Sequence, residues 1–384
     1  MKILYCINSL KNPGGMERVL INKANYFVKN YNYDISILTT NQNNQKIFYK
    51  NINTKIKFYD LGINYDLDYN KSFFNRIIPF LKKQYIHREK LKKFLYNNKF
   101  DVVISLGCEE TFFLPVIKDG SKKIREVHFN KEYRKILVKS FNKSFMYKIK
   151  AYFDTWREEK LINKYDEFVV LTNEDKELWN NKKVRVIPNS LTFKSEKISN
   201  LGNKKIISVG RLDGQKGYDL LIKVWKKVIK KSPDWILEIY GEGADRKKLE
   251  KQIKENNLEN SLSLKGTINN IQDKYLESSI YVMSSRYEGM PMVLLEAMSY
   301  GLPVVSFDCK CGPKDIIKNG KSGYLCKSYD VNEMAEKIEK LIMDEESRKK
   351  MGVIAKKISL NYSENKIMKK WKELFEKLGE KDGK

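Results

Sequence analysis

Short apolar runs alternate with amphipathic stretches and glycine turns over the first half of the chain. Apolar runs bounded by polar residues predict buried strands, and they cover residues 2–7, 34–39 and 101–105. A glycine turn at 13–15 follows the first run, and apolar residues then recur at near-helical spacing: Val19, Leu20, Ala24 and Phe27. The order of strand, glycine turn, helix and strand is typical of a doubly wound parallel sheet.

The second half of the chain repeats this order. The strands that we predict there lie at 206–209, 235–240, 261–264, 280–283 and 303–307, and the helices at 218–231, 245–256 and 292–300. We therefore predict two α/β domains, residues 1–187 and residues 188–363. The final amphipathic helix and tail, residues 364–384, precede no further strand, so this helix is free to pack elsewhere.

Length and composition agree with two domains in a reducing compartment. The 384 residues exceed what a single hydrophobic core usually serves. No apolar stretch approaches the roughly 20 residues that a membrane-spanning helix needs, and the first residues turn polar too soon for a signal peptide. Five cysteines, an odd and sparse set, fit the cytosol better than a disulfide framework.

The charge is strongly positive and unevenly distributed. The chain has 74 Lys+Arg against 48 Asp+Glu, a formal charge of +26, and residues 71–150 alone contain 20 basic and 7 acidic side chains. Most are Lys, whereas base and phosphate recognition recruits Arg, and zinc-finger and RNP motifs are missing. We expect no nucleic-acid partner. Solvated lysines explain most of the charge, and an anionic membrane surface is the sharper interpretation of residues 71–150.

The segment 284–301 concentrates candidate chemistry directly after a predicted strand, where open α/β sheets bind ligands. Gly289 permits close backbone approach, and the amides of Met292, Val293 and Leu294 begin a helix that can hold an anion. Glu296 interrupts an apolar stretch, which costs free energy unless its carboxylate is hydrogen-bonded, for example by sugar hydroxyls. The alternative is that this carboxylate simply faces water.

A second loop supplies cations. Residues 210–217 follow another predicted strand and contain Arg211 and Lys216 among three glycines. Arg can bind phosphate oxygens in a fork, and Lys adds a compact charge. The loop lacks the Walker pattern. Each cation alone is usually a surface ion-pair partner, but both on a glycine loop at a sheet edge indicate a diphosphate site.

Five segments in order resemble one enzyme family. They are GGMER (14–18), VGRLDGQKGYDLL (209–221), YGEG (240–243), SRYEGMPMVLLEAMSYGLPVVSFD (285–308) and the GPKDII and NGKSGYL run (312–325). The sequence resembles the retaining, nucleotide-sugar-dependent glycosyltransferases of family 4, of the bacterial surface-polysaccharide type. The E-x7-E signature of that family matches Glu288 and Glu296. The resemblance is stronger over 205–345 than before residue 190.

The resemblance implies a fold and a reaction. The fold is GT-B, two Rossmann-like doubly wound parallel-sheet domains that face each other across a cleft, with the C-terminal helix packed back on the N-terminal domain. The reaction moves a hexose or N-acetylhexosamine from a UDP-sugar to a saccharide, with same-face attack through an oxocarbenium-like transition state. UDP rather than GDP is a choice weighted by the family.

The resemblance also implies roles for single residues. Arg211 and Lys216 would bind the diphosphate, Glu296 the ribose, and Glu288 the donor sugar. The residues expected to bind the donor are Gly14, Gly15, Arg211, Lys216, Gly266, Thr267, Glu288, Gly289, Met290, Met292, Val293, Leu294 and Glu296. His128 falls where the family often has a histidine near the transferred sugar, which gives the expected catalytic set His128, Glu288, Arg211 and Lys216. A hydrogen-bonded structural histidine is the alternative for His128.

We expect neither a metal nor a cofactor besides the donor. Asp66-Leu67-Asp68 resembles the metal motif of another glycosyltransferase architecture but lies in a polar loop. Cys309-Lys310-Cys311 has no metal-like spacing. His87, within a lysine-rich helix, is expected at the surface.

The basic runs of the first half suggest where an acceptor binds. Apolar residues in them are Ile77, Ile78, Phe80, Leu81, Leu91, Phe94, Leu95, Ile136, Leu137, Val138 and Phe141, and the interspersed lysines are Lys82, Lys83, Lys90, Lys92, Lys93, Lys135, Lys139 and Lys143. Basic amphipathic segments lie at membrane surfaces, and GT-B enzymes receive the acceptor in this domain. We expect a polyprenyl-diphosphate-linked saccharide acceptor and an enzyme held peripherally at the inner face of the cell membrane. Ordinary core helices with solvated lysines explain the pattern equally well.

Two other functions stay open from the sequence. One is a UDP-sugar epimerase, or a phosphorylase, of the same fold. The other is a basic module that binds nucleic acid or membrane.

Overall fold

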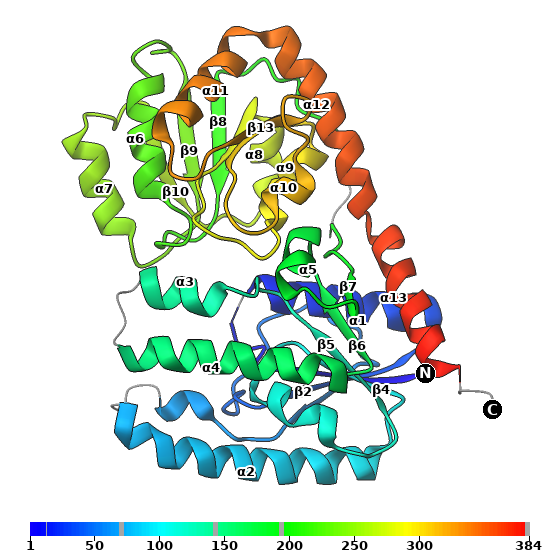
Figure 1. Cartoon of the computed structure of the whole chain (residues 1–384). Coiled ribbons are helices and arrows are strands. Elements are labelled where there is room, and N and C mark those ends of the chain that lie inside the picture. Colours follow the sequence, from blue (N-terminus) through cyan, green and yellow to red (C-terminus); the bar gives the residue numbers. More distant parts are fainter. Residues whose placement is uncertain (13, 69–72, 141–144, 192–195, 381–384) are drawn as a thin grey trace.

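The computed structural model describes residues 1–12, 14–68, 73–140, 145–191 and 196–380 and shows two parallel-sheet domains, one above the other in Figure 1. Pro13 of the predicted glycine turn lies outside the described residues. Among the described residues, no helix combines the length and the apolar character that crossing a membrane demands.

The N-terminal domain is built on a seven-stranded sheet of order β3-β2-β1-β4-β5-β6-β7, in which every pairing is parallel. Its elements are β1 (Lys2–Ile7), α1 (Gly15–Tyr31), β2 (Asp34–Thr39), β3 (Lys57–Asp60), α2 (Phe73–Asn98), β4 (Val102–Ser105), β5 (Lys122–Glu126), α3 (Tyr133–Ser140), α4 (Phe145–Leu161), β6 (Glu167–Val170), α5 (Asn173–Trp179) and β7 (Val184–Val186). Helices cover both faces of a parallel sheet, which explains why β1, β2 and β4 read as near-continuous apolar runs.

The C-terminal domain has a six-stranded sheet of order β10-β9-β8-β11-β12-β13, again parallel in each pairing. Its elements are β8 (Lys205–Val209), α6 (Tyr218–Val228), β9 (Ile236–Tyr240), α7 (Arg246–Glu255), β10 (Leu262–Gly266), α8 (Ile271–Leu276), β11 (Ile280–Met283), α9 (Met292–Ser299), β12 (Val304–Phe307), α10 (Pro313–Ile316), β13 (Gly323–Cys326), α11 (Val331–Met343) and α12 (Glu345–Ser359). Two Rossmann-like domains were predicted, and the fold confirms them.

Both sheets have a topological switch point, where the chain leaves adjacent strands in opposite directions. In the C-terminal domain β8 and β11 are neighbours, yet the chain runs outward from β8 to β9 and from β11 to β12. Ligands of doubly wound folds bind at such points, outside the carboxyl ends of the strands. The loops that follow β8 and β11 are the two segments that carry the predicted donor-binding residues.

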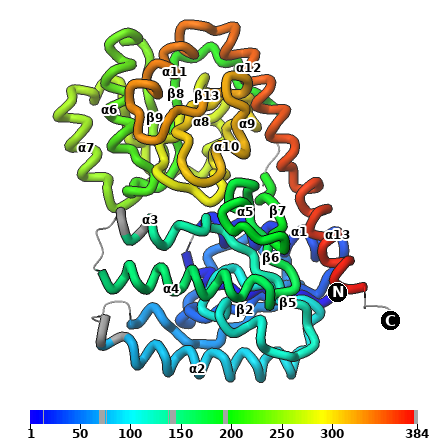
Figure 2. Tube along the Cα trace, in the orientation of Figure 1, coloured from blue at the N-terminus to red at the C-terminus, as the bar shows by residue number. Residues whose placement is uncertain are grey.

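The last helix returns to the N-terminal domain. Helix α13 (Glu364–Gly379) continues downward from α12 along one side of the molecule and reaches α1 (Figure 2). Its apolar face is buried in the core of the N-terminal domain: Ile367, Met368, Trp371, Leu374 and Phe375. Phe375 meets Phe27 of α1 edge to face, with ring centroids 5.2 Å apart. The prediction that the C-terminal helix packs back on the first domain is confirmed.

One prediction about the first domain was wrong. His87 lies in α2 as expected, but its side chain is buried rather than at the surface. Its ring contacts Phe113 edge to face, and its Nδ1 lies 3.2 Å from the hydroxyl of Tyr65. Burial lowers the pKa of His87 to about 3. Most of the lysines near it in sequence are exposed, and their number misled the interpretation.

Candidate active site

Lys216 and Glu288 meet at the switch point of the C-terminal sheet. The Lys216 ammonium lies 2.7 Å from Oε1 of Glu288, and both side chains are mostly buried. Gly217 begins α6 in a left-handed conformation, and a Cβ there would lie 2.2 Å from the carbonyl oxygen of Ser284. The absence of a side chain at this glycine therefore lets the two loops pack together, which places the cation beside the carboxylate.

Glu296 is buried in α9 and does not face water, so that alternative from the sequence is wrong. Its Oε1 lies 2.7 Å from Nη2 of Arg18, and its Oε2 accepts a hydrogen bond of 3.4 Å from the hydroxyl of Tyr275. Arg18 belongs to α1 of the other domain, so this ion pair crosses the cleft. Carboxylate oxygens can also accept hydrogen bonds from the hydroxyl groups of a ligand.

The start of α9 faces the N-terminal domain. A Cβ on Gly289 would lie 2.1 Å from the carbonyl oxygen of His128, so only glycine permits this contact. The first helical amides, those of Met292 and Val293, have no acceptor within their own helix. The amide of Leu294, which we expected to be free, donates instead to the carbonyl of Pro291 at 3.1 Å.

Met290, which belongs to the predicted donor-binding motif, also packs the loop that precedes α9 against the rest of the protein. Its side chain is buried in the core of the C-terminal domain, and its sulfur accepts a 3.2 Å hydrogen bond from the amide of Asn189. That bond ties the α9 loop to the segment between the two sheets.

Arg211 is the most exposed of the predicted donor-binding cations. Its side chain is 73% exposed, and its guanidinium contacts only its own loop, Asp213 at 3.3 Å and Gln215 at 3.3 Å, among the described partners. Because its contacts are few and exposed to solvent, the Arg211 side chain gives up little free energy of interaction when it turns toward an anion.

The glycines of the first domain lie at the start of α1, the helix from which Arg18 reaches the other domain. Gly14 caps α1, and its amide and carbonyl both bond the hydroxyl of Tyr49, at 3.0 and 2.9 Å. A Cβ on Gly15 would meet no heavy atom of the described chain within 4 Å. Gly15 therefore borders open space, as a wall against a ligand would.

Gly266 and Thr267 lie at the end of β10. Gly266 has a positive φ of 77°, and its carbonyl accepts a 2.9 Å hydrogen bond from the amide of Gly241. Thr267 is exposed directly after it. In the sheet, β10 lies two strands away from β8, on the side of β8 opposite to β11.

His128 follows β5 and is buried beside Glu126. Its Nε2 lies 3.2 Å from Oε1 of Glu126, and two residues further on Nδ2 of Asn130 donates to the carbonyl of Glu288 at 2.9 Å. The loop that contains His128 thus contacts the loop that contains Glu288. A role was predicted for His128 but not for Glu126, Lys23 or Arg18, although Arg18 stands in the GGMER motif.

The two motifs that we set aside are engaged in other contacts. Asp66 pairs with Lys11 at 2.7 Å and Asp68 with Lys83 at 2.5 Å, both within the N-terminal domain. Cys309 and Cys311 are buried, and burial raises the pKa of both thiols. Within the described ranges, no three His, Cys, Asp or Glu side chains are grouped as a metal site would need.

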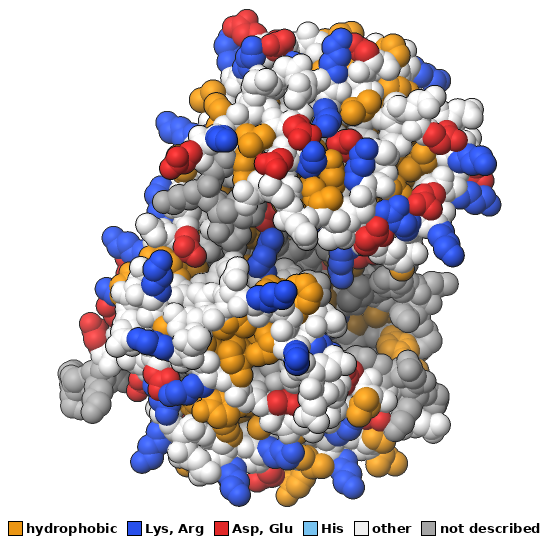
Figure 3. Space-filling model, turned by 180° about the vertical axis from the view of Figure 1, so that it is seen from behind, with side chains coloured by type: hydrophobic (Ala, Val, Ile, Leu, Met, Phe, Trp, Pro, Cys, Tyr) orange, Lys and Arg blue, Asp and Glu red, His pale blue; other side chains and the backbone are white. Residues whose placement is uncertain are grey.

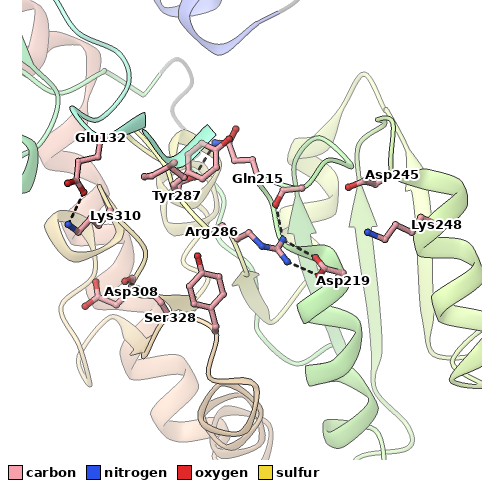
Figure 4. Close-up of a pocket in the computed structure, with 13 residues that line it drawn as sticks. Glu132, Gln215, Asp219, Asp245, Lys248, Arg286, Tyr287, Asp308, Lys310 and Ser328 are labelled. Atoms are coloured by element: carbon pink, nitrogen blue, oxygen red, sulfur yellow. Dashed lines mark hydrogen bonds and ion pairs between the residues drawn. The ribbon is translucent and has the colours of Figure 1, made fainter. Parts of the chain in front are cut away.

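A cavity of about 730 Å³ opens beside the donor loops, between the start of α3 and the C-terminal domain. In Figure 4, Arg286 points at Asp219, with Nη2 to Oδ2 at 2.7 Å, and Lys310 reaches Glu132 of the N-terminal domain at 2.9 Å. Tyr287, which precedes Glu288, lines the same cavity. The cavity therefore adjoins the candidate active site and has room for a saccharide.

Comparisons with known proteins show which family this chain is similar to. The family model "Glycosyl transferases group 1" matches residues 190–358. An uncharacterized glycosyltransferase of Haemophilus influenzae is 32% identical over 97% of this chain and 99% of its own length. The GalNAc-alpha-(1->4)-GalNAc-alpha-(1->3)-diNAcBac-PP-undecaprenol alpha-1,4-N-acetyl-D-galactosaminyltransferase of Campylobacter jejuni is 27% identical, over 98% of each chain.

The fold has a counterpart of known structure. The crystal structure of S. aureus TarM in complex with fondaparinux, alpha-GlcNAc-glycerol and UDP superposes with a TM-score of 0.72 at 19% identity, over 97% of this chain and 99% of that one. This likeness concerns the GT-B fold. Two carboxylates, each paired with a cation, lie at the switch point, and a relative matches the chain over its full length. These findings lead to one conclusion: the chain belongs to the group 1 glycosyl transferases.

Proposed function

We propose that this enzyme transfers a hexose or N-acetylhexosamine, with retention, from a UDP-sugar to a polyprenyl-diphosphate-linked saccharide in the synthesis of a bacterial surface glycan. The observation that carries the proposal is the presence of two ion pairs at the switch point of the C-terminal sheet. Glu288 is held by Lys216, and Glu296 is held by Arg18 across the cleft. A nucleotide sugar presents a diphosphate to the cations and hydroxyls to the carboxylates.

The proposed reaction breaks the bond between the anomeric carbon and the diphosphate oxygen. The electron pair leaves with UDP, while an acceptor hydroxyl bonds to the anomeric carbon on the same face and its proton goes to the departing phosphate. Arg211, Lys216 and the amides that begin α9 would stabilise the charge on the leaving diphosphate. The proposal requires no metal or cofactor besides the donor.

The relatives support the donor and the acceptor class. TarM was crystallised with UDP. The Campylobacter relative acts, by its name, on a saccharide linked through diphosphate to undecaprenol and forms an alpha linkage. The cavity beside Tyr287 and Glu132 could receive the acceptor saccharide next to the donor sugar.

A basic apolar surface of the N-terminal domain supports the proposed membrane contact. Helices α3, α4 and α2 lie one below the other in Figure 1, with α3 nearest to the C-terminal domain. Large exposed apolar side chains lie on the first half of α2 and on the first two-thirds of α4: Ile77, Ile78, Leu81, Tyr85, Phe145, Met146, Ile149, Tyr152, Phe153 and Trp156. Lys82 and Lys148 are exposed among them. We infer that this surface binds anionic lipid, which would place the enzyme at the inner face of the membrane.

Part of the predicted amphipathic run belongs to the core instead. Leu91 and Leu95 are fully buried. Ile136 lines the cavity, whereas Phe141, Lys143 and the side chains of Leu137 and Lys139 lie outside what the structure describes. The proposed lipid surface is therefore narrower than the sequence indicated, and α4 contributes much of it.

Nucleic acid is a poorer partner than lipid. On the face opposite to that of Figure 1, Lys and Arg side chains are scattered over both domains and interspersed with Asp and Glu, without one continuous basic stripe (Figure 3). Electrostatic binding to a phosphate backbone needs such a stripe.

Two experiments test the proposal. UDP-sugars are incubated with a soluble acceptor analogue in which a disaccharide is linked through diphosphate to a short alkyl chain. A product that keeps the α configuration of the donor at its new anomeric centre is expected, and an inverted product would contradict retention. Binding is then measured by flotation with vesicles that contain about one-third phosphatidylglycerol. Trp156→Ala combined with Ile149→Ser should lose flotation, while Lys223→Ser on α6 should not; equal flotation of all three proteins would contradict the lipid surface.

A further inference from the structure

Three charged or ionisable side chains form a buried chain inside the N-terminal domain. Lys23 of α1, Glu126 at the end of β5 and His128 are each buried. The Lys23 ammonium lies 2.5 Å from Oε1 of Glu126, and the same oxygen lies 3.2 Å from Nε2 of His128. One carboxylate oxygen therefore joins a cation in the core to the ring at the cleft.

Stability alone does not account for these residues. Lys23 lies on the helix face that otherwise buries Leu20, Ala24 and Phe27 against the sheet. A buried ion pair costs several kcal/mol of desolvation per ion, and apolar residues of similar size are often as stable. An amphipathic helix would be expected to have an apolar residue at this position.

The C-terminal helix closes the buried end of the chain. The Lys23 ammonium lies 3.8 Å from the ring centroid of Trp371 in α13, and 5.9 Å from that of Tyr5 in β1. Both rings offer a π face to the cation and exclude water from it. The ammonium is thereby directed toward Glu126.

At the other end of this buried chain of side chains, near His128, hydrogen bonding is less complete. Oε2 of Glu126 and Nε2 of His128 are buried and have no hydrogen bond of good geometry within the described structure. Burial raises the pKa of Glu126, but Lys23 and His128 outweigh that effect and hold it at about 2. The carboxylate is thus ionised next to the ring throughout the physiological range.

The backbone of His128 contacts Gly289, in the loop that contains Glu288. A displacement of His128 would therefore also displace this loop of the donor site. Two acidic groups interact with His128: Glu126 of β5, 3.2 Å from Nε2, and Glu17 of α1, on whose pKa His128 acts. Burial raises the pKa of Glu17, while His128 and, from the C-terminal domain, Arg211 lower it. Both neighbours of the ring are therefore acidic, and Lys23 is the cation that offsets Glu126.

We propose that Glu126 and Lys23 are positioning residues for His128: the carboxylate anchors Nε2 of the ring at the cleft, and the ammonium under Trp371 balances that carboxylate. This inference rests on the proposed function only where it concerns the catalytic use of the His128 ring. The residues that position the ring extend from the cleft through the core of the N-terminal domain to Trp371 of the C-terminal helix.

The chain itself offers a direct readout. It contains two histidines, and burial lowers the pKa of His87 to about 3, so any ring titration seen between about pH 5 and pH 9 belongs to His128. Ring signals of the untagged protein are followed by NMR over that range in wild type, Glu126→Gln, Lys23→Met and the double variant. The double variant removes both charges and serves if a single variant does not fold.

The two single substitutions are expected to move the His128 midpoint in opposite directions. Glu126→Gln should lower it by about one unit or more, because the ring then faces Lys23 without the carboxylate, and Lys23→Met should raise it. The double variant should fall between them. If donor turnover is measurable, the acid limb of its pH profile should move with the midpoint, while KM for the donor changes less than kcat.

An unchanged midpoint in Glu126→Gln, or in the double variant if the single one does not fold, would overturn the proposal. A merely structural role would lower the melting temperature and leave kcat of the folded protein unchanged. Because the titration needs no donor, a wild-type protein that turned over no UDP-sugar would refute the proposed function and leave this result to stand by itself.

Discussion

The guanidinium of Arg18 in the N-terminal domain lies 2.7 Å from the carboxylate of Glu296 in the C-terminal domain. The Glu296 side chain is only 3% exposed, whereas Arg18 is 39% exposed. The pair therefore bridges the cleft from a fixed carboxylate to an adjustable cation. A ribose that binds Glu296 would share or replace Arg18.

Glu296→Gln should weaken UDP binding by roughly 10- to 100-fold, since hydrogen bonds to a charged acceptor contribute about 1.5–3 kcal/mol. Isothermal titration calorimetry measures the affinity. Glu259→Gln, an exposed carboxylate on the same domain, is the matched control and should bind UDP as wild type does. Wild-type affinity in Glu296→Gln would remove this residue from the donor site.

Lys216→Met should reduce turnover of the donor by about 100- to 1000-fold, because it removes a cation from the developing diphosphate charge. It also leaves Glu288 without its 2.7 Å partner. Lys223→Met, an exposed lysine of α6, controls for the loss of charge. A variant at 216 with the turnover of the control would show that the diphosphate binds elsewhere.

Gly289→Ala should reduce turnover by about 100-fold, since the added methyl would lie 2.1 Å from the His128 carbonyl and displace one domain from the other. Small-angle scattering should show a larger radius of gyration than for wild type. Gly214→Ala, where a methyl meets no described atom within 4 Å, should leave the radius unchanged. A Gly289→Ala protein with wild-type compactness and turnover would contradict the interdomain contact.

His87 should make the protein acid-sensitive. Its pKa is about 3 in the fold against about 6.5 unfolded, so between these values the unfolded chain binds more protons. Stability is then fully present above about pH 6.5 and falls by about 1.4 kcal/mol for each unit below it. Urea unfolding at pH 7 and pH 5 should show a smaller loss for His87→Asn than for wild type. Equal losses would contradict the buried, neutral imidazole.

The sequence predicted elements with local apolar runs, but it could not predict which distant side chains neutralise charges that are buried in a strand. Strand β5, with the sequence KKIRE, reads as polar, yet Lys123 and Arg125 are buried in it. Lys123 pairs with Asp119, and Arg125 pairs with Glu158 of α4 at 2.8 Å. Asp119 lies only four residues before Lys123, whereas Glu158 comes from a distant helix, so a strand before His128 could be predicted but the buried partner of Arg125 could not.

The candidate site divides in the same way. Glu288, Glu296, Arg211 and Lys216 lie in two short segments of one domain, so their motifs could be recognised. The partners in the first domain could not, because Arg18 meets Glu296 from 278 residues away and Lys23 meets Glu126 from 103 residues away. Only the packing of α1 against both the sheet and the opposite domain unites them.

The most direct test of the UDP-sugar site is a donor-hydrolysis screen across UDP- and GDP-sugars that measures released nucleotide. Wild type is expected to release UDP from at least one UDP-hexose or UDP-N-acetylhexosamine, and Glu296→Gln and Lys216→Met are expected to release far less. No release from any UDP-sugar, or equal release by wild type and both variants, would contradict a UDP-sugar site between the loops that follow β8 and β11.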